Sequence, residues 1–535
     1  MRHQDLTQQV VTVIFLLHAT SVRELANFSL NGGVAWYYLC NPFLRLIIML
    51  VKQSKNSFIR IYDNGTLGYI NNQLTRLDRS YDENGAVFLS ELSRNPRNIN
   101  DIISNLLSIY TDVDRKELED DFSDFIQDLE NHKFVITGGS PEELEKKDIT
   151  FSYSFEKPGK SAYDYTQITK QSVDKTSENF FFEHDKSKPR LASLQFELTS
   201  RCNERCIHCY IPNGKKNSGS DMSFEEFKFI IDQYVAMGGL HVTLSGGEAL
   251  MNKDILKILR YCREKDLQIS LLTNLIALKD EQIPVLKEVN LSLIQVSLYS
   301  MDPLKHDKIT TVRGSFEKTK SAILKLHAAN VPVQISCPVM KANKDGYDEV
   351  IKFAQSLRMK VQTDYIMMAE ANFDTSNLAN RLSIEESEEV IRDIIDNDPD
   401  YKKAILDIEP WSSLPREEFA NMPLCGAGMN YLCVTVNGDV YPCAGWQSMI
   451  VGNVFKQTLI DIWENSKQLN YIRGVKQKDF PKCMECEARD YCYMCLVRNY
   501  NESHGDMFKI NKHFCKVAFL NKRLVEEWRS ELKIQ

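Results

Sequence analysis

The sequence predicts an α/β protein: a partial (β/α)6 barrel of the TIM type, preceded by a small winged-helix-like α+β domain and followed by a cysteine-rich, metal-stapled domain. Three observations support this prediction. Strand-like and helix-like segments alternate six times between residues 190 and 400, which is typical of parallel strands joined by right-handed crossovers. Short strand and helix patterns precede that region. Eight of the 14 cysteines lie between residues 425 and 515.

Composition places the chain among ordinary globular proteins and disfavours one class of partner. The chain has 535 residues, more than a single domain usually holds, with 43% apolar and 26% charged residues. Its net charge of −8 argues against nucleic acid as a partner, because phosphate binding needs concentrated Lys and Arg. The tight cysteine spacings indicate metal ligands that are kept reduced, so we expect a cytoplasmic protein.

Residues 1–50 are an N-terminal extension whose role the sequence does not define. "VVTVIFLL" at 10–17 has the length of a signal-peptide core but lacks a strong basic lead and a cleavage site. The apolar stretch 35–51 is broken by Pro42 and Arg45 and is too short to span a bilayer comfortably. A membrane-associated N-terminus is the less favoured alternative, and we expect the working protein to begin near Met49.

Residues 51–138 are predicted to form the small α+β domain. Two short strands flank a "DNG" turn, three helical patterns follow, and a last short strand closes the unit. In order, these segments are 58–62, 66–70, 85–94, 99–110, 115–132 and 133–138. Residues 139–189 are polar and irregular, and we interpret them as a linker.

The barrel is predicted for residues 190–400. Its strands are expected at 191–199, 241–247, 268–275, 293–300, 331–339 and 360–368. Helical patterns between them lie at 223–239, 252–266, 315–330 and 347–358. In such barrels the loops after the strands carry the chemistry, so we expect the functional residues at the carboxyl ends of these strands.

The loop after the first predicted strand holds three cysteines, Cys202, Cys206 and Cys209, with no fourth nearby. Structural zinc takes four protein ligands, and catalytic zinc usually takes three drawn from His, Glu or Cys. Three thiolates without a partner suit a [4Fe–4S] cluster better, with the fourth iron open to a small molecule. His208 lies inside the loop, but its position favours solvent exposure over ligation.

A CxxxCxxC loop followed by an aromatic residue, on the first strand of a partial barrel, resembles the signature of radical S-adenosylmethionine (SAM) enzymes. The resemblance implies that the open iron binds SAM and that a 5′-deoxyadenosyl radical abstracts hydrogen from substrate. It also implies cofactor-binding roles for several residues at strand ends. These are Tyr210 near the adenine, Gly246, Gly247 and Glu248 of a "GGE" motif near the amino group, and Asn274 and Ser297 at the barrel mouth.

One position departs from the pattern of many relatives. They carry Arg four residues after the His of an "HD" pair, where it contacts the SAM carboxylate. Here that position is Thr310, and Arg313 lies three residues further along. The carboxylate partner is therefore left unassigned.

The C-terminal cysteines resemble the SPASM domain, an iron–sulfur domain. Its pattern is matched by Cys425, Gly438 and Cys443, followed by a second run that differs only by two residues instead of three before Cys495. The resemblance implies two auxiliary [4Fe–4S] clusters. One would be held by Cys483, Cys486, Cys492 and Cys515, and the other by Cys425, Cys443 and Cys495.

Two questions about this domain stay open. Cys433 could complete the second set, although its apolar, strand-like surroundings also suit a buried structural cysteine. Zinc is the alternative to auxiliary clusters, because C-x2-C-x5-C-x2-C also suits tetrahedral sulfur sites. Cys40, Cys262 and Cys337 lie outside both groups and are interpreted as structural.

Residues 51–138 resemble the PqqD-like recognition domain of enzymes that modify ribosomally made peptides, in which a leader peptide adds as a strand to the sheet edge. The chain as a whole then resembles radical SAM–SPASM peptide maturases of the sactipeptide and ranthipeptide type. This implies a precursor peptide as partner, a flavodoxin or ferredoxin as electron donor, and thioether crosslinks as product.

Other functions remain possible at this point. Carbon–carbon or carbon–oxygen crosslinking is the nearest alternative, followed by sulfatase or quinohemoprotein maturation. The non-enzymatic alternative is an iron–sulfur adaptor that only binds the leader. The intact CxxxCxxC-Y and GGE motifs argue against the adaptor, since a pure binding protein needs neither.

Overall fold

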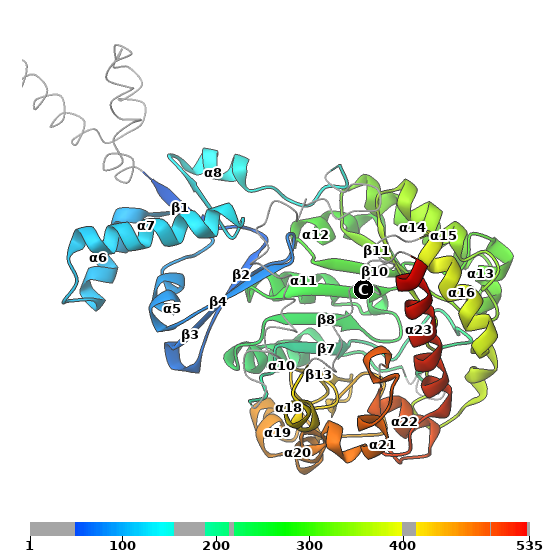
Figure 1. Cartoon of the computed structure of the whole chain (residues 1–535). Helices are drawn as coiled ribbons and strands as arrows, with labels where there is room; N and C mark the ends of the chain where they lie inside the picture. The colour runs from blue at the N-terminus through cyan, green and yellow to red at the C-terminus, as the bar shows by residue number, and fades with distance from the viewer. Residues whose placement is uncertain (1–48, 155–187, 213–218, 398–413, 493, 532–535) are drawn as a thin grey trace, which may run out of the picture. The chain divides into compact units, whose positions relative to one another are not determined.

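The structure is a computed structural model that describes residues 49–154, 188–212, 219–397, 414–492 and 494–531 (Figure 1). Three segments discussed above lie wholly or mostly outside the described residues: the apolar stretch 10–17, the apolar stretch 35–51 and the predicted linker. Among the helices that are described, none has the length and apolar character needed to cross a membrane. The chain divides into two compact units: Met1–Ser54 with Glu91–Asp148, and Lys55–Ser90 with Ile149–Gln535.

The first unit is a three-stranded antiparallel sheet with three helices. Its sheet order is β5-β1-β6, formed by β1 (Leu50–Gln53), β5 (Arg97–Asn98) and β6 (Val135–Gly138). The helices are α6 (Ile99–Ile109), α7 (Arg115–Asn131) and α8 (Pro141–Lys147). Helix α7 buries Leu118, Phe122, Ile126 and Leu129, so its apolar stripe follows the predicted helical spacing.

Helix α8 corrects the prediction of an irregular segment after residue 138. The Ser140 side chain caps the helix by accepting from the Glu143 backbone N–H, and Pro141 occupies the first turn. Acidic residues at the start and lysines at the end complement the helix dipole. These capping signals were present in the sequence, but the high polarity of the segment concealed them.

The second unit begins with another three-stranded antiparallel sheet. It consists of β2 (Ser57–Tyr62), β3 (Leu67–Asn72) and β4 (Leu77–Tyr81), in that order, and is followed by α5 (Glu83–Ser90). The division into units therefore crosses the range 51–138, which the sequence analysis treated as one domain. Strand β4 was also absent from the predicted elements.

This sheet groups with the barrel because it is bound to the amino-terminal ends of the barrel strands. The Tyr62 hydroxyl donates to the Gly238 carbonyl at 3.0 Å, and the Arg60 guanidinium donates to the Gly239 carbonyl at 2.8 Å. The Gln73 amide donates to the Asn290 carbonyl at 2.9 Å. The acceptors directly precede barrel strands, so the sheet closes that end of the barrel.

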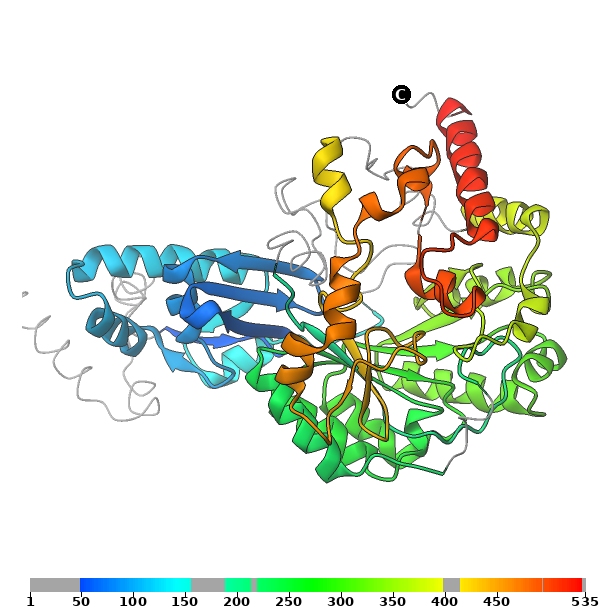
Figure 2. The same cartoon turned by 90° about the horizontal axis from the view of Figure 1, so that it is seen from below.

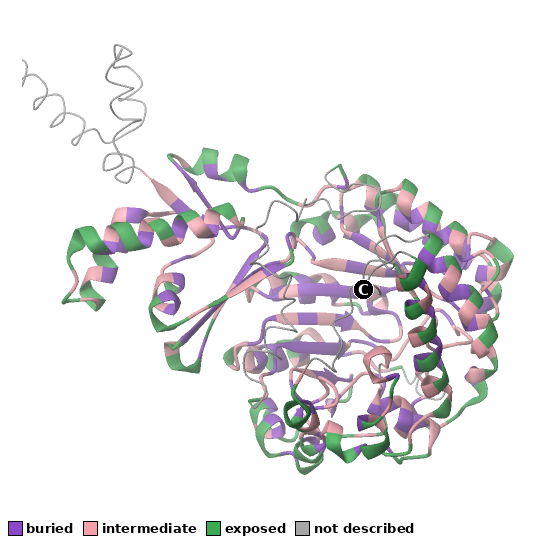
Figure 3. Ribbon diagram, viewed as in Figure 1, coloured by how far each residue is buried: buried purple, intermediate pink, exposed green. Residues whose placement is uncertain are grey.

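The six predicted barrel strands are confirmed, and each pairs in parallel with its sequence neighbour. They are β7 (Ser193–Glu197), β8 (His241–Ser245), β9 (Gln268–Thr273), β10 (Leu293–Ser297), β11 (Val333–Pro338) and β12 (Lys360–Asp364). The helices along this part of the chain are α10 (Phe224–Ala236), α11 (Ile255–Glu264), α12 (Ile283–Glu288), α13 (Pro303–Thr310), α14 (Ser315–Ala328), α15 (Asp348–Ser356) and α16 (Ile384–Asn397). Burial alternates along β8, β10 and β11, and the apolar residues on their buried face belong to the main core (Figure 3).

The C-terminal region extends the barrel sheet and then continues in short helices (Figure 2). Strand β13 (Tyr431–Val434) pairs in parallel with β7, and β14 (Asp439–Tyr441) and β15 (Gly452–Asn453) follow antiparallel. The helices are α18 (Arg416–Asn421), α19 (Leu459–Asn465), α20 (Lys467–Gly474), α21 (Pro481–Met484), α22 (Leu496–Glu502) and α23 (Lys512–Glu531). Helix α23 begins at Lys512, so Cys515 lies on it.

Candidate active site and cysteine clusters

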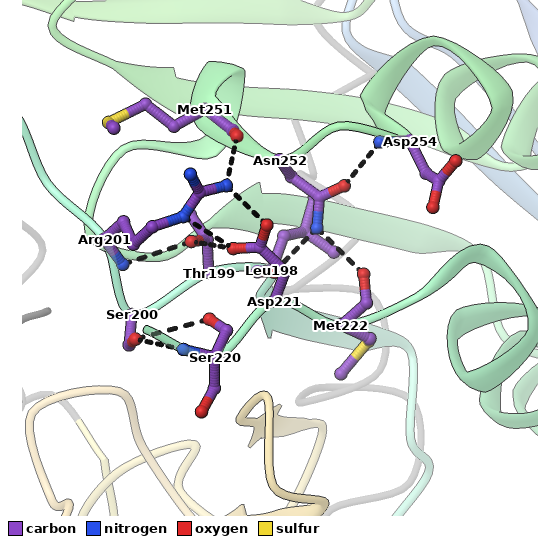
Figure 4. Close-up of polar contacts among 10 residues, drawn as sticks. All are labelled: Leu198, Thr199, Ser200, Arg201, Ser220, Asp221, Met222, Met251, Asn252 and Asp254. Atoms are coloured by element: carbon purple, nitrogen blue, oxygen red, sulfur yellow. Dashed lines mark hydrogen bonds and ion pairs between the residues drawn. The ribbon is translucent and has the colours of Figure 1, made fainter. Parts of the chain in front are cut away.

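The three-cysteine loop leaves the carboxyl end of β7, and ion pairs and hydrogen bonds hold its base (Figure 4). The Arg201 guanidinium pairs with the Asp221 carboxylate and donates to the Met251 carbonyl at 2.8 Å. The Thr199 hydroxyl donates to the same carboxylate at 2.5 Å. The Asn252 amide bridges the carbonyls that flank this segment, from Leu198 and Met222. Arg201 and Asp221 were missed by the sequence analysis, because no pattern links residues on either side of the loop.

The two glycines after β8 let the next loop pack directly against the cysteine loop. The Gly247 N–H donates to the Thr199 carbonyl at 2.8 Å. A Cβ atom at Gly247 would lie 2.3 Å from the Arg201 carbonyl oxygen and 3.0 Å from the Cys202 Cβ. A Cβ at Gly246, whose φ is +140°, would lie 2.6 Å from the Thr199 carbonyl oxygen. Only glycine fits this contact, since both obstructing oxygens belong to the backbone.

Glu248 lies in the interior, and its carboxylate joins the β8 loop to the end of β9. It accepts from the Leu250 N–H at 3.0 Å, the Thr273 hydroxyl at 2.6 Å and the Asn274 N–H at 2.8 Å. The side chain is 2% exposed, and burial raises the pKa of its carboxyl. The structure shows that Glu248 joins the two loops. That Glu248 also accepts a hydrogen bond from a bound amino group remains a prediction.

The other residues predicted to bind the cofactor also lie at strand ends. The Asn274 amide donates to the Asn203 side-chain oxygen, inside the cysteine loop, at 2.7 Å. Ser297 ends β10. Burial raises the pKa of the Tyr210 phenol, and the charges of Glu197, Cys433, Cys209 and Cys443 raise it further.

Cys206 has two polar neighbours that the sequence analysis missed, Glu204 and Tyr299. Its thiol donates to the Glu204 carboxylate at 3.2 Å, and the Tyr299 hydroxyl lies 3.9 Å from the sulfur. Burial raises the pKa of the Cys206 thiol well above its ordinary value, and the charges of Glu204 and Cys209 raise it further. The one available signal for Tyr299 was its position two residues after Ser297, on the same face of the chain leaving β10.

Thr310 lies in the interior. Its side chain is fully buried, and its hydroxyl lies 2.7 Å from the Ser315 hydroxyl. Asp307 of the "HD" pair accepts from the backbone N–H groups of Gly314 and Phe316, which start α14. The pair is thus used for local structure, and the carboxylate partner stays unassigned.

The C-terminal cysteines surround one cavity of about 310 Å³. Its lining also includes Arg489, Arg498 and the rings of Phe419, Phe514 and Phe519. Six of the seven predicted auxiliary ligands line it: Cys425, Cys483, Cys486, Cys492, Cys495 and Cys515. Soft thiolates around a roomy, partly aromatic cavity are the donor set that an iron–sulfur cluster requires.

Electrostatic coupling divides these cysteines into two groups. Burial raises the pKa of Cys425 to about 12, with further increases from the charges of Cys495 and Cys443. Burial likewise raises the pKa of Cys492 to about 11, with further increases from Cys515, Cys483 and Cys486. The assignment of these thiols to two ligand sets remains a prediction.

Cys433 lies on β13 and is fully buried. Burial raises the pKa of its thiol, and the charges of Glu197 and Cys443 raise it further. In the described part of the chain, no three His, Cys, Asp or Glu side chains meet closely enough to hold a single metal ion.

Comparison with known proteins defines the class. Residues 196–354 match the Radical SAM superfamily, residues 425–487 match SPASM, an iron–sulfur cluster-binding domain, and residues 79–135 match coenzyme PQQ synthesis protein D (PqqD). The fold and these matches define a radical SAM enzyme. The chain combines the domains of radical SAM/SPASM enzymes with a PqqD-like domain, and it is homologous to peptide-modifying enzymes of this kind. Its domains imply a [4Fe–4S] cluster, SAM binding and auxiliary clusters.

Several characterised proteins are similar to the chain. An AdoMet-dependent heme synthase of Methanosarcina barkeri is 27% identical over 330 residues, covering 58% of this chain and 92% of the relative. A PqqA peptide cyclase of Xanthomonas oryzae is 25% identical over 309 residues, covering 56% and 82%. The subtilosin biosynthesis protein AlbA of Bacillus subtilis is 26% identical over 318 residues, covering 58% and 68%.

Among solved structures, Streptococcus suis SuiB bound to the precursor peptide SuiA aligns with a TM-score of 0.54 at 17% identity. The alignment covers 84% of this chain and 96% of SuiB. At this identity the likeness concerns the fold. It confirms the α/β partial barrel with flanking domains that the sequence predicted.

Proposed function

We propose that the chain is a maturase that modifies a ribosomally made precursor peptide, forming thioether crosslinks between a cysteine sulfur and a carbon of another residue. The observation that carries the proposal is the hydrogen bond from the Gln447 amide, four residues after Cys443, to the Glu197 carboxylate at 2.7 Å. Glu197 ends β7, the strand from which the three-cysteine loop leaves, so the chain near Cys443 reaches the same end of the barrel as that loop. Radical chemistry and capture of a substrate thiolate then occur side by side.

In this proposal Cys202, Cys206 and Cys209 hold the cluster that binds SAM. When bound, the cluster and SAM supply the reducing electron and the 5′-deoxyadenosyl radical that removes a substrate hydrogen. The chain's own contribution is geometric: the Arg201–Asp221 pair and the glycine contact at Gly247 fix the cysteine loop against the barrel. Tyr210, Glu248, Asn274 and Ser297 are proposed to position SAM.

The second cysteine region is proposed to hold two auxiliary clusters, in the sets defined above. Removing two hydrogens to form a thioether releases electrons, and nearby clusters offer an acceptor for them. A cluster iron also lowers the pKa of a bound substrate thiol. The three-cysteine set lacks a fourth protein ligand, unless Cys433 supplies it, and is the candidate for this contact.

A peptide substrate is supported by two observations. The PqqD-like match and the names of two relatives, a PqqA peptide cyclase and a bacteriocin biosynthesis protein, point to peptides. The inner face of the barrel is polar: the Gln295 and Gln334 amides both donate to the Gln362 side-chain oxygen, at 3.3 and 3.0 Å. Amides at such positions suit the hydrogen-bonding groups of a peptide backbone. We further propose a flavodoxin or ferredoxin as electron donor and the cytoplasm as the site of action.

The test is mass spectrometry of a candidate cysteine-containing precursor peptide, chosen from the short reading frames that neighbour the gene, after incubation with reconstituted enzyme, SAM and reductant. A thioether removes two hydrogens per crosslink and makes one thiol unreactive toward iodoacetamide. Loss of two hydrogens with the thiol still reactive would indicate carbon–carbon or carbon–oxygen crosslinking instead. An unchanged peptide alongside 5′-deoxyadenosine formation would contradict the peptide assignment.

A second candidate function follows from the heme synthase relatives, one of which is 27% identical to this chain. The matched length of 330 residues leaves the rest of the chain without a counterpart. A PqqD-like domain has no evident use in tetrapyrrole chemistry, so the peptide assignment is preferred. Incubation of the enzyme with a porphyrin substrate, followed by absorption spectroscopy, separates the two.

A further inference from the structure

The Cys206 sulfur has apolar neighbours and a hydroxyl neighbour that iron ligation by itself does not need. This sulfur lies beside an apolar cluster formed by Tyr299, Ile309 and Met340, against which Cys206 and Ile207 pack. The Tyr299 hydroxyl lies 3.9 Å from the sulfur, within the range of a hydrogen bond to sulfur. The Tyr299 side chain is 4% exposed, so little water competes with that contact.

Tyr299 is held from several sides. Its carbonyl accepts from the Asn343 amide at 2.8 Å, and its N–H donates to the His306 Nδ1 at 3.3 Å. Its ring lies edge-on to His208, with centroids 4.9 Å apart, and tilted against His306 at 5.4 Å. These contacts leave the phenol little freedom, so its hydroxyl position is set by the fold.

We propose that Tyr299 is a positioning residue whose hydroxyl donates a hydrogen bond to the Cys206 sulfur when that sulfur ligates the cluster, and thereby raises the cluster's reduction potential. Hydrogen bonds to ligand sulfurs stabilise the more electron-rich, reduced state. Glu204, whose carboxylate can only accept from a thiol, cannot replace this donor once the sulfur is a thiolate. The inference rests on the proposed assignment of Cys206 as a ligand.

The test is an electron paramagnetic resonance redox titration of the reconstituted Tyr299→Phe enzyme. The signal to follow is the one that the Cys202, Cys206 and Cys209 triple-Ala variant lacks. We expect a more negative midpoint potential with iron content unchanged, whereas Tyr471→Phe, at an exposed tyrosine, leaves the midpoint unchanged. In heavy water, electron–nuclear double resonance should detect one exchangeable hydrogen near the cluster that Tyr299→Phe removes.

The outcomes separate the two hypotheses. If the triple-Ala variant keeps all its iron, the proposed ligand assignment fails first. If that variant loses iron but Tyr299→Phe has the wild-type midpoint and the same exchangeable hydrogen, the hydrogen-bond proposal is wrong. Loss of iron in Tyr299→Phe alone would reduce its role to packing and also overturn the proposal.

Discussion

The two cysteine regions are built in different ways. The loop at 202–209 is attached to barrel loops through their backbones: the Glu248 N–H donates to Arg201, and the Arg205 and Ile207 N–H groups donate to carbonyls at the end of α13. The region at 425–515 surrounds a cavity of about 310 Å³ with short helices and loops. The first site is therefore held in place by backbone hydrogen bonds of the folded barrel. We expect the second site to depend on the metal that it binds.

Because of this difference, we expect metal loss at the first site to affect activity and metal loss at the second site to affect stability. Losing the cluster from the first site should abolish chemistry but leave the barrel folded, because the main core does not include the cysteines of the 202–209 loop. Losing metal from the second site should loosen the region itself, because metal binding there supplies folding free energy. The following experiments test that contrast, from the largest expected effect to the smallest.

Replacing Cys202, Cys206 and Cys209 together by Ala should have the largest effect. We expect 5′-deoxyadenosine formation to fall to background, a loss greater than the roughly 10–100-fold that removal of an outer-shell partner costs. The melting temperature of the barrel should change little. Cys262→Ala, at a buried cysteine of α11 outside both groups, is the control. Residual 5′-deoxyadenosine above background would show that the loop is not the SAM site.

Removing iron with an anaerobic chelator should affect the two regions unequally. Hydrogen exchange should rise strongly at residues 425–515, whereas the strands of the barrel stay protected, because metal binding contributes folding free energy only where the fold is incomplete without it. If both regions of the iron-free enzyme were equally protected from hydrogen exchange, the proposed difference between the two cysteine regions would be wrong.

Gly247→Ala should disturb the contact between the two loops. A Cβ there would lie 2.3 Å from a backbone oxygen that cannot rotate away, so the cysteine loop must shift. We expect a loss of roughly 10–100-fold in SAM cleavage, with partial loss of iron. Gly474→Ala is the matched control, since no atom lies within 4 Å of a Cβ at that position. Wild-type activity in Gly247→Ala would show that the glycine contact is dispensable.

Arg201→Met should loosen the base of the loop without touching a ligand. The guanidinium ties the loop to Asp221 and to the Met251 carbonyl, and charged hydrogen bonds of this kind contribute about 1.5–3 kcal/mol each. We expect slower cluster assembly during reconstitution and a lower final iron content. Arg260→Met, which removes an exposed pair with Glu288, is the control and should assemble normally.

Cys433→Ala is expected to have the smallest effect. Cys433 is fully buried on strand β13, so we expect unchanged iron content and a modest loss of stability. A loss of about one cluster's iron, as for Cys443→Ala, would identify Cys433 as the missing ligand.

The sequence predicted those parts of the molecule that rest on local patterns. The six barrel strands follow from β-α alternation, whereas the two cysteine groups of the C-terminal region are what the resemblance to the SPASM domain implies. The docking of β2–β4 on the barrel was not predictable, because its acceptors at Gly238, Gly239 and Asn290 are backbone carbonyls that leave no trace in side-chain patterns. Tyr299 was missed for a related reason: its partner Cys206 is 93 residues away, and nothing local indicates which loops meet.

The most direct test of the central claim is iron and acid-labile sulfide per chain after anaerobic reconstitution, for the wild type and the triple-Ala variant. Three [4Fe–4S] clusters give about twelve irons per chain, with about four lost in the variant. That result would support separate sites, one formed by the fold and two by their metals. About four irons together with bound zinc would contradict it, because the C-terminal region would then be a structural zinc module without a role in electron transfer or thiolate capture.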